Sequence, residues 1–514
     1  MAVDKEMLTL DKLIERIALY KSGKPNSSAE SLGMFFNTSE YQYFYDTGTG
    51  KVFRLDNNLH EFLQKLLYEN SSVEELEKAA CQWNINTQEF LDYIVKEDLL
   101  KGTAGNALYN DAFLKKARED IKTKSRQLIL ELTGACNLRC KYCIYSAQET
   151  SFRGFNSESI TEEIIRASID YMNEHAAEEV FITFYGGEPL IRFDLMKYAI
   201  EYARAKITNR EVHFGFTTNM TLMTKEIAEY LVQVPNMSMM CSLDGPEDVQ
   251  NASRVYANGG GTFQDVIKGL NFLREAIANT GNDTFSVKFN AVYMVPYNKE
   301  KLYRIDELFK DLCNITKNSS YSISYPTLGT VPTELEALYP PEEGNTMWEW
   351  MSDMVKKCDS IADLKLSGIV ESLAVIHQRQ LSIQAMTNIP MNACCIPGAR
   401  RIYVDTKGDI YTCERIDKSP KIGNILSGLD IDTIFEKYFY EYSDKSIAHC
   451  KNCWAAKMCP LCYADRMTED GIASDAHSYC DQVKEHLKRK FILYHEILEV
   501  EPQKLDFLNS LITV

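Results

Sequence analysis

The stretch from Leu128 to Ser146, LILELTGACNLRCKYCIYS, constrains the chain most, because an apolar run leads directly into three closely spaced cysteines. With 15 cysteines in 514 residues, a chance Cys-x3-Cys-x2-Cys triple is expected on the order of 0.01 times. Thiolates at this spacing favour an iron-sulfur cluster or zinc, and three ligands leave one coordination position open. The stretch therefore predicts a metal site on Cys136, Cys140 and Cys143.

This stretch resembles the signature of radical S-adenosylmethionine (SAM) enzymes, in which an aromatic residue, here Tyr142, precedes the third cysteine. The resemblance implies a four-iron cluster whose free iron is chelated by the amino and carboxylate groups of SAM. One electron from the cluster then cleaves SAM to methionine and a 5′-deoxyadenosyl radical, which takes a hydrogen atom from substrate.

Alternating strand-like and helical runs follow from Leu128. Six such units predict an α/β fold, a partial (β/α)6 radical SAM barrel over 128–335 with its active site at the carboxyl ends of the strands. The predicted strands are Leu128–Thr133, Glu179–Phe184, Val212–Thr218, Met237–Leu243, Phe285–Met294 and Tyr321–Tyr325.

Strand ends supply the remaining candidate contacts to SAM. Gly186 and Gly187 allow close backbone approach, and Glu188 can accept a hydrogen bond from an ammonium. This turn resembles the family's GGE motif, which holds the SAM amino group. By the same resemblance, positions near the SAM ribose and carboxylate are Thr218, Asn219, Ser242 and Asp244.

Residues 31–105 predict a small module of three aromatic-rich strands and three helices, with Ser72 and Glu75 as a capping box. It follows a helix and a Gly/Pro/Ser-rich connector within 1–30. A winged-helix-like module before a radical SAM core resembles the recognition element of peptide-modifying enzymes. Such elements bind a leader peptide as an added strand on a sheet edge. A plain packing appendage is the alternative.

Eight more cysteines gather near the C-terminus, and their order resembles the SPASM domain, which carries two auxiliary four-iron clusters. The resemblance places Cys450, Cys453, Cys459 and Cys480 on the outer cluster, and Cys395, Cys413 and Cys462 on the inner one. Whether Cys394 is the fourth inner ligand stays open. Zinc is the competitor, but paired-cysteine zinc ribbons usually separate their pairs by about 15 to 20 residues, and here only five separate Cys453 from Cys459.

The four other cysteines, Cys81, Cys241, Cys313 and Cys358, are isolated and predict buried structural thiols. We expect a charged linker over 106–127, a bridging region over 336–390, the SPASM domain over 391–490 and a helical tail over 491–514.

Charge and hydropathy limit the partners. Lys and Arg total 56 against 73 Asp and Glu, and this net charge of −17 argues against a nucleic-acid partner. The N-terminal residues lack the features of a signal peptide, and no run is long and apolar enough for a membrane. We therefore expect a cytoplasmic protein, and the cluster type implies an oxygen-sensitive one.

The three modules together resemble thioether-forming maturases of sactipeptide and ranthipeptide pathways. The resemblance implies a ribosomally made precursor peptide bound through its leader, and an electron donor such as flavodoxin or ferredoxin. A maturase making carbon-carbon or carbon-oxygen crosslinks is one alternative. Another is an anaerobic sulfatase-maturing enzyme, whose catalytic aspartate corresponds to Glu414. Outside enzymology, a zinc-stabilised peptide-binding protein would lack a use for the GGE turn.

Overall fold

A computed structural model describes residues 8–21, 29–102, 105–145, 154–282, 284–327, 330–340, 345–386, 391, 394–415, 419–473 and 477–511. The end of the cysteine stretch, from Ser146, and most of the 21–31 connector lie outside the described residues.

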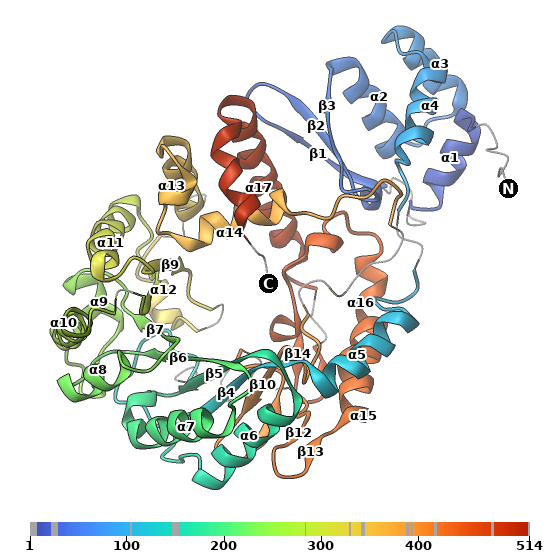
Figure 1. Ribbon diagram of the computed structural model, residues 1–514. Coiled ribbons are helices and arrows are strands. Elements are labelled where there is room, and N and C mark those ends of the chain that lie inside the picture. The colour runs from blue at the N-terminus through green and yellow to red at the C-terminus, as the bar shows by residue number, and fades with distance from the viewer. Residues whose placement is uncertain are drawn as a thin grey trace.

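A curved sheet of ten strands in the order β13-β12-β11-β10-β4-β5-β6-β7-β8-β9 forms the centre of the described structure (Figure 1). Its parallel part confirms the six predicted strands, which pair with one another in chain order. The bounds are β4 Ser125–Thr133, β5 Ala176–Gly186, β6 Glu211–Thr218, β7 Met237–Ser242, β8 Ser286–Val292 and β9 Ser320–Ser324.

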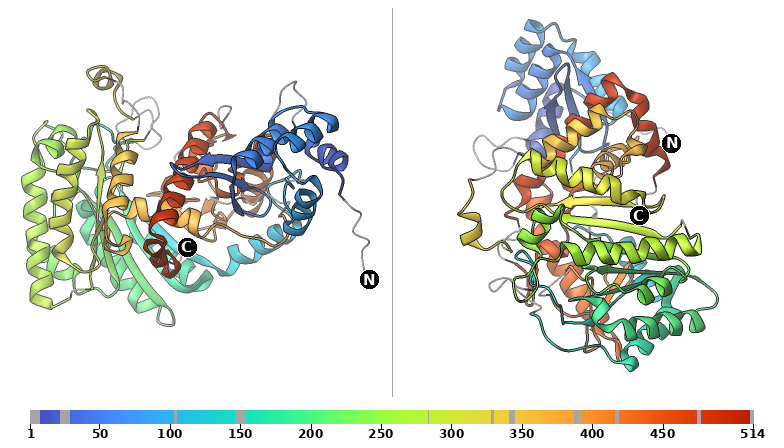
Figure 2. Two further views of the ribbon diagram at one scale, coloured as in Figure 1. Left: turned by 90° about the horizontal axis from the view of Figure 1, so that it is seen from above. Right: turned by 90° about the vertical axis from the view of Figure 1, so that its left-hand side faces the viewer.

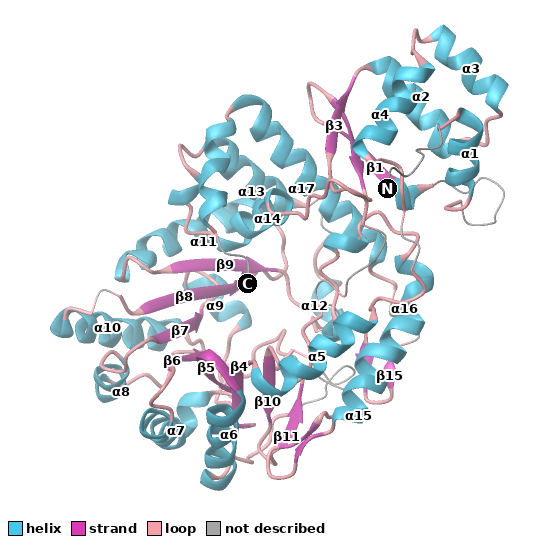
Figure 3. Ribbon diagram, turned by 45° about the vertical axis from the view of Figure 1, so that its right-hand side comes forward, coloured by secondary structure: helices cyan, strands magenta, loops and turns pink. Residues whose placement is uncertain are grey.

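Helices cover the outer face of this sheet (Figure 3) because alternate strand residues are apolar. On β5, Val180, Ile182 and Phe184 are fully buried toward the helices, whereas Thr183 and Tyr185 between them are half-buried on the inner face. The helices are α6 Glu162–His175, α7 Phe193–Lys206, α8 Lys225–Leu231, α9 Glu247–Ser253, α10 Phe263–Thr280 and α11 Lys299–Leu312. The short helix α12 (Thr333–Glu336) lies instead beside the radical SAM cysteine loop, where Leu335 packs against the cluster of Leu138, Tyr142 and Met294.

The barrel stays open, as predicted, because β9 does not return to β4. Instead β10 (Arg401–Val404) pairs with β4 in parallel, with Tyr403 opposite Ile129. Three short antiparallel strands extend the sheet further: β11 Asp409–Tyr411, β12 Gly423–Asn424 and β13 Gly428–Leu429. The C-terminal cysteine region thus shares one sheet with the barrel.

The N-terminal module contains the predicted three-stranded antiparallel sheet and three helices, including the Ser72–Glu75 capping box, and the preceding helix α1 packs into the same core. Its elements are α1 Leu10–Ala18, β1 Gly33–Asn37, β2 Gln42–Asp46, β3 Val52–Leu55, α2 Asn57–Tyr68, α3 Val73–Gln82 and α4 Thr87–Glu97. One sheet face packs on these helices through Phe35 and Phe44.

The opposite sheet face packs on α17 (Cys480–Val500), so the module is not a loosely attached appendage (Figure 2). Phe36 and Tyr43 contact the ring of His495, with centroids 4.9 and 5.0 Å away, and Tyr45 contacts Phe491 at 4.9 Å. The module and the C-terminal region therefore share a buried aromatic interface.

Hydrogen bonds from two different regions of the chain hold the turn between β2 and β3. Lys457, between the predicted ligands Cys453 and Cys459, donates to the carbonyls of Thr47 at 2.7 Å and Gly48 at 3.0 Å. Arg379 donates to the Gly50 carbonyl at 2.8 Å. These bonds join the hairpin turn to the outer cysteine loop and to the bridging region.

Two predicted segment boundaries need revision. The charged run taken as a linker forms the helix α5 (Asp111–Thr123), whose Ala117 and Ile121 are buried in the main core. The boundary at 490/491 falls inside α17, which runs unbroken from its first residue, Cys480.

The remaining elements lie in the bridging and C-terminal regions. They are α13 Thr346–Lys357, α14 Ser367–His377, α15 Ile431–Thr433, a π-helix Ile434–Glu441, α16 Tyr442–Cys450, β14 Met467–Thr468, β15 Gly471–Ile472 and a 3₁₀ segment Pro502–Ser510. Among the described residues, no helix combines the length and apolar character needed to cross a membrane.

Candidate active site

The three-cysteine loop leaves the carboxyl end of β4 and packs directly against the end of β5. Gly187 N–H donates to the Thr133 carbonyl, and Glu188 N–H donates to the Ala135 carbonyl, both at 2.9 Å. A Cβ on Gly187 would lie 2.2 Å from the Ala135 oxygen, and one on Gly186, whose φ is +130°, would lie 2.2 Å from the Thr133 oxygen. In the structure, these glycines thus admit the cysteine loop itself.

Glu188 joins the ends of β5 and β6. Its buried carboxylate accepts from the Thr218 hydroxyl at 2.8 Å, the Asn219 backbone N–H at 2.7 Å and the Leu190 N–H at 3.0 Å. Burial raises the pKa of this carboxyl, and these donors partly offset the rise. Because a carboxylate offers about four acceptor positions, one remains for an ammonium.

Asn219 extends the contact to the cysteine loop. Its side-chain amide donates to Asn137 Oδ1 at 2.9 Å and lies 4.0 Å from the sulfur of Cys136. Sequence reasoning missed Asn137, although a polar side chain inside a ligand loop was the available signal.

Tyr142 belongs to a buried polar triad. Its hydroxyl donates to Asp244 at 2.8 Å and accepts from Arg254 Nη1 at 2.8 Å. The triad ties the cysteine loop to the end of β7, so the hydroxyl of Tyr142 is already occupied within the protein. Arg254, which no sequence pattern indicated, supplies the positive charge at this end of the sheet.

The cysteine thiols sit in a largely apolar setting formed with Leu138, Tyr142 and Met294. Burial raises the pKa of Cys136 to about 12 and of Cys140 to about 11. As free thiols these residues would be protonated and inert at neutral pH, whereas metal ligation deprotonates a thiol. The donor set therefore fits a resident metal cluster better than a nucleophile.

Residues 130–309 match the family model of the radical SAM superfamily. This chain carries a radical SAM domain.

Relatives extend the match beyond the radical SAM domain. The cysteine-type anaerobic sulfatase-maturating enzyme of Clostridium novyi (strain NT) is 23% identical over 65% of this chain and 86% of its own length. The radical SAM cyclopropyl synthase TigE of Paramaledivibacter caminithermalis is 24% identical over 64% of this chain and 65% of its own. A solved structure of native anSMEcpe with bound AdoMet superposes with a TM-score of 0.53 at 19% identity, over 75% of this chain and 100% of that one. A second structure of anSMEcpe holds AdoMet and the Kp18Cys peptide. The likeness in fold includes a SPASM-like C-terminal region after the radical SAM domain.

Two groups form among the cysteines of the SPASM-like region. In the outer group, burial raises the pKa of Cys453 to about 12, and the nearby charges of Cys450 and Cys459 raise it further. Cys459 in turn interacts with Cys450 and Cys480. The structure thus brings together the four residues predicted for the outer cluster.

The inner group contains the other four. Burial raises the pKa of Cys462 to about 12, with further rises from Asp465, Cys413 and Cys395. Burial likewise raises the pKa of Cys394 to about 12, and Cys462 and Cys395 add to it. Cys394 therefore lies among the three cysteines predicted for the inner cluster.

The spacing of these sulfurs bears on the choice of metal. Tetrahedral zinc with Zn–S bonds of about 2.3 Å needs sulfurs roughly 3.8 Å apart. Among the described residues, no three cysteine sulfurs all lie within 4.8 Å of one another. The described sulfurs therefore do not form a single-ion tetrahedral site.

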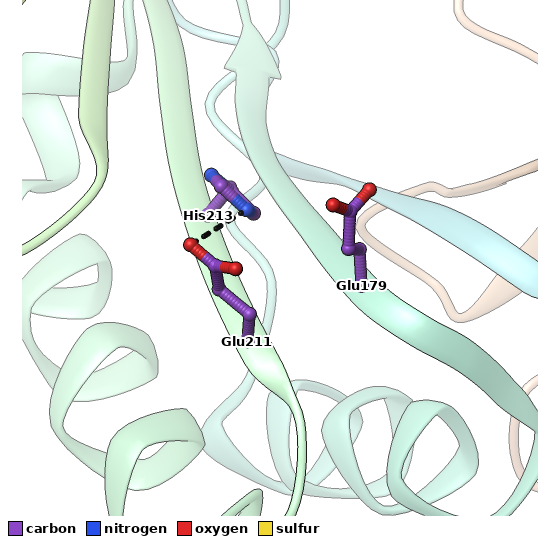
Figure 4. A group of neighbouring side chains, drawn as sticks. All are labelled: Glu179, Glu211 and His213. Atoms are coloured by element: carbon purple, nitrogen blue, oxygen red, sulfur yellow. Dashed lines mark ion pairs between the residues drawn. The ribbon is translucent and has the colours of Figure 1, made fainter.

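Another group does meet the 4.8 Å limit, namely Glu179 on β5 with Glu211 and His213 on β6 (Figure 4). Both glutamates are exposed and already engaged, Glu179 with Arg126 at 3.4 Å and Glu211 with His213 at 3.4 Å. The group lies toward the amino ends of the strands, away from the cysteine loop of the radical SAM domain.

Glu414 follows Cys413 and pairs with Arg401 at 3.6 Å, with 18% of its side chain exposed. Ser242 ends β7 opposite Asn290 of β8. Of the isolated cysteines, Cys241 and Cys313 are buried as expected, Cys358 is half-buried, and Cys81 is exposed, contrary to expectation. Cys81 faces solvent because it lies on the outer side of the short helix α3.

Proposed function

We propose that this chain is a radical SAM maturase that installs an intramolecular thioether, cysteine sulfur to carbon, in a ribosomally made precursor peptide. When bound, SAM and its four-iron cluster on Cys136, Cys140 and Cys143 supply a 5′-deoxyadenosyl radical for hydrogen abstraction. Residues Gly186, Gly187, Glu188, Thr218, Asn219, Ser242 and Asp244 would hold SAM or shape its site.

The placement of the inner cysteine group carries this proposal. Cys394 and Cys395 precede β10, and Cys413 follows β11, which runs back antiparallel to it. The inner group therefore lies at the amino end of the β4–β10 pair, opposite the radical SAM loop. The nine residues of β4 span roughly 25 Å, so a peptide segment can lie along the inner face of the sheet between the two sites.

That inner face is polar. Gln127 donates to Thr183 at 2.8 Å, and Ser322 donates to Asn290 at 2.7 Å, so hydroxyl and amide groups lie where a peptide backbone needs partners. The Kp18Cys peptide held in the second anSMEcpe structure supports a peptide-binding role for such a surface.

The proposed crosslinking reaction balances in atoms and electrons. One hydrogen leaves a peptide carbon, one proton leaves a cysteine thiol, and a carbon–sulfur bond forms while SAM becomes methionine and 5′-deoxyadenosine. The carbon radical returns one electron, which the inner and then the outer cysteine group would accept through auxiliary clusters.

Mass spectrometry with thiol alkylation tests the proposal on a cysteine-containing precursor encoded beside this protein. The expected product is lighter by two hydrogens and carries one fewer alkylable thiol. Loss of two hydrogens with every thiol alkylable would instead show a carbon-carbon or carbon-oxygen crosslink, or oxidation of a serine as in sulfatase maturation. Either result would overturn the thioether assignment.

A further inference from the structure

Arg466 is a buried cation between the two cysteine groups. Only 3% of its surface is exposed, and its Nε has no hydrogen-bond partner among the described residues. Its side-chain partners among the described residues include Tyr442, whose ring centroid lies 5.7 Å from the guanidinium carbon, but no carboxylate of the described residues lies within 4 Å of the guanidinium. A buried charge without a counter-ion is costly, so we expect an anion to face it in the working protein.

Cysteine sulfurs surround this guanidinium. It hydrogen-bonds Cys450, and its charge also interacts with Cys459 and Cys480 of the outer group and with Cys394 of the inner group, so most of its cysteine partners belong to the outer group. Thiolates ligating a four-iron cluster would carry the missing negative charge. This interaction is independent of the cysteine spacing and gives the outer group a built counter-charge.

Tyr442 continues the contact to the inner group. Arg466 Nη1 donates to the Tyr442 hydroxyl at 3.2 Å, and that hydroxyl in turn hydrogen-bonds Cys394. A chain of hydrogen bonds therefore links Cys450, Arg466, Tyr442 and Cys394, all in the cores of the two groups.

We infer that Arg466 is a positioning residue that raises the reduction potential of the outer cluster and so draws the electron from the inner to the outer site. Reduction adds one negative charge to a cluster, and a fixed positive charge beside it stabilises the reduced form. Charge and hydrogen bonds at cluster sulfurs are the protein's means of setting this potential. The step moves one electron and no proton, because the guanidinium stays protonated.

The inference rests on the cluster assignment of the proposed function, and one experiment separates the two. The full chain is prepared with Cys136, Cys140 and Cys143 all changed to Ala, which leaves the two auxiliary sites. About eight irons per chain are expected. A lower count in this background would refute the auxiliary clusters themselves and therefore the proposed function.

In that background, Arg466→Met is compared with Arg466→Lys by redox titration followed with electron paramagnetic resonance. The uncharged variant should lower one midpoint potential by at least 59 mV, a tenfold change in a one-electron equilibrium. Arg466→Lys keeps the positive charge and should therefore keep most of the midpoint potential that Arg466→Met loses. The control Arg274→Met removes an exposed arginine of α10 and should change neither potential.

Tyr442→Phe breaks the link to Cys394 and keeps the cation, so it should lower the other potential instead. Eight irons with both potentials unchanged in Arg466→Met would overturn the inference. If Arg466→Met loses about four irons, retention of eight in Arg466→Lys supports the need for charge, whereas loss in both variants would make Arg466 a packing residue and contradict it.

Discussion

At the scale of single residues, the radical SAM site is assembled by backbone contacts as much as by side chains. Gly186 and Gly187 let two strands' ends and the cysteine loop share hydrogen bonds within 3 Å. Glu188 then fixes the ends of β5 and β6 with three accepted bonds. Cluster and SAM would thus be positioned by the same few residues.

Gly187→Ala tests this packing. The added Cβ meets the Ala135 carbonyl oxygen at 2.2 Å and its carbon at 2.5 Å, and backbone cannot move aside without shifting the cysteine loop. We expect loss of about four irons and of SAM cleavage, measured by iron analysis and 5′-deoxyadenosine release. Gly368→Ala on α14, where a Cβ meets nothing within 4 Å, is the matched control. Full cleavage activity in Gly187→Ala would count against this view of the site.

At the scale of elements, the N-terminal sheet depends on α17. His495 packs against Phe36 and Tyr43 and donates from its ring to the Phe491 carbonyl at 2.8 Å. Burial lowers the pKa of His495 from 6.5 to about 4. The folded protein therefore holds this ring neutral over a range in which the unfolded chain binds a proton.

Because the folded-state pKa of His495 is depressed, its stabilising effect is complete above pH 6.5 and declines as the pH falls toward 4. The interface should lose about 1.4 kcal/mol per pH unit in that window. Hydrogen exchange of the β1–β3 amides at about pH 7.5 and 5.5 measures the loss. His495→Gln keeps a donor but does not titrate, so it should remove this pH dependence. An equal loss in that variant would assign the effect to other groups.

The elements also show what sequence can and cannot predict. Barrel strands were predictable because each combines apolar alternation with a polar strand end. The pairing of β10 with β4 was not, because it joins residues about 270 positions apart, Tyr403 and Ile129, and four-residue strands carry little pattern.

The same limit applies within the site. Cysteine spacing and the GGE turn indicated the candidate ligands. Arg254 and Arg466 could not be predicted, because the residues next to them in sequence give no sign that an arginine is buried. The charged run at 111–123 was also predicted wrongly as a linker, because its charges outnumber the few residues, among them Ala117 and Ile121, that pack into the core.

At the scale of the whole molecule, we propose the outer edge of β3 as the leader site, whereas α17 packs on the sheet face formed by Phe36, Tyr43 and Tyr45. This edge pairs with no strand in the part of the chain described. Phe53 of β3 contacts Tyr93 of α4, with ring centroids 6.0 Å apart, and Tyr93 is 45% exposed. An unpaired edge with an aromatic wall suits an added peptide strand.

Tyr93→Ala should therefore weaken leader binding about tenfold, roughly 1.4 kcal/mol, without changing SAM cleavage. Fluorescence anisotropy with a labelled leader peptide measures the affinity. Tyr303→Ala, which removes a 50% exposed tyrosine from α11, is the control. Deleting residues 1–105 is a poorer test, because it would uncover the aromatic interface with α17. If both Tyr93→Ala and Phe53→Ala bind the leader with unchanged affinity, the leader does not bind at the edge of β3.

The proposed function requires three four-iron clusters, of which only the one on Cys136, Cys140 and Cys143 would cleave SAM. Iron content and 5′-deoxyadenosine release, measured anaerobically on the intact chain and on the variant with these three cysteines changed to Ala, test it most directly. We predict about twelve irons with cleavage for the intact chain, and about eight without cleavage for the variant. Cleavage of SAM by the variant, or zinc in place of iron in the intact chain, would contradict the assignment of a SAM-cleaving iron-sulfur cluster to these three cysteines.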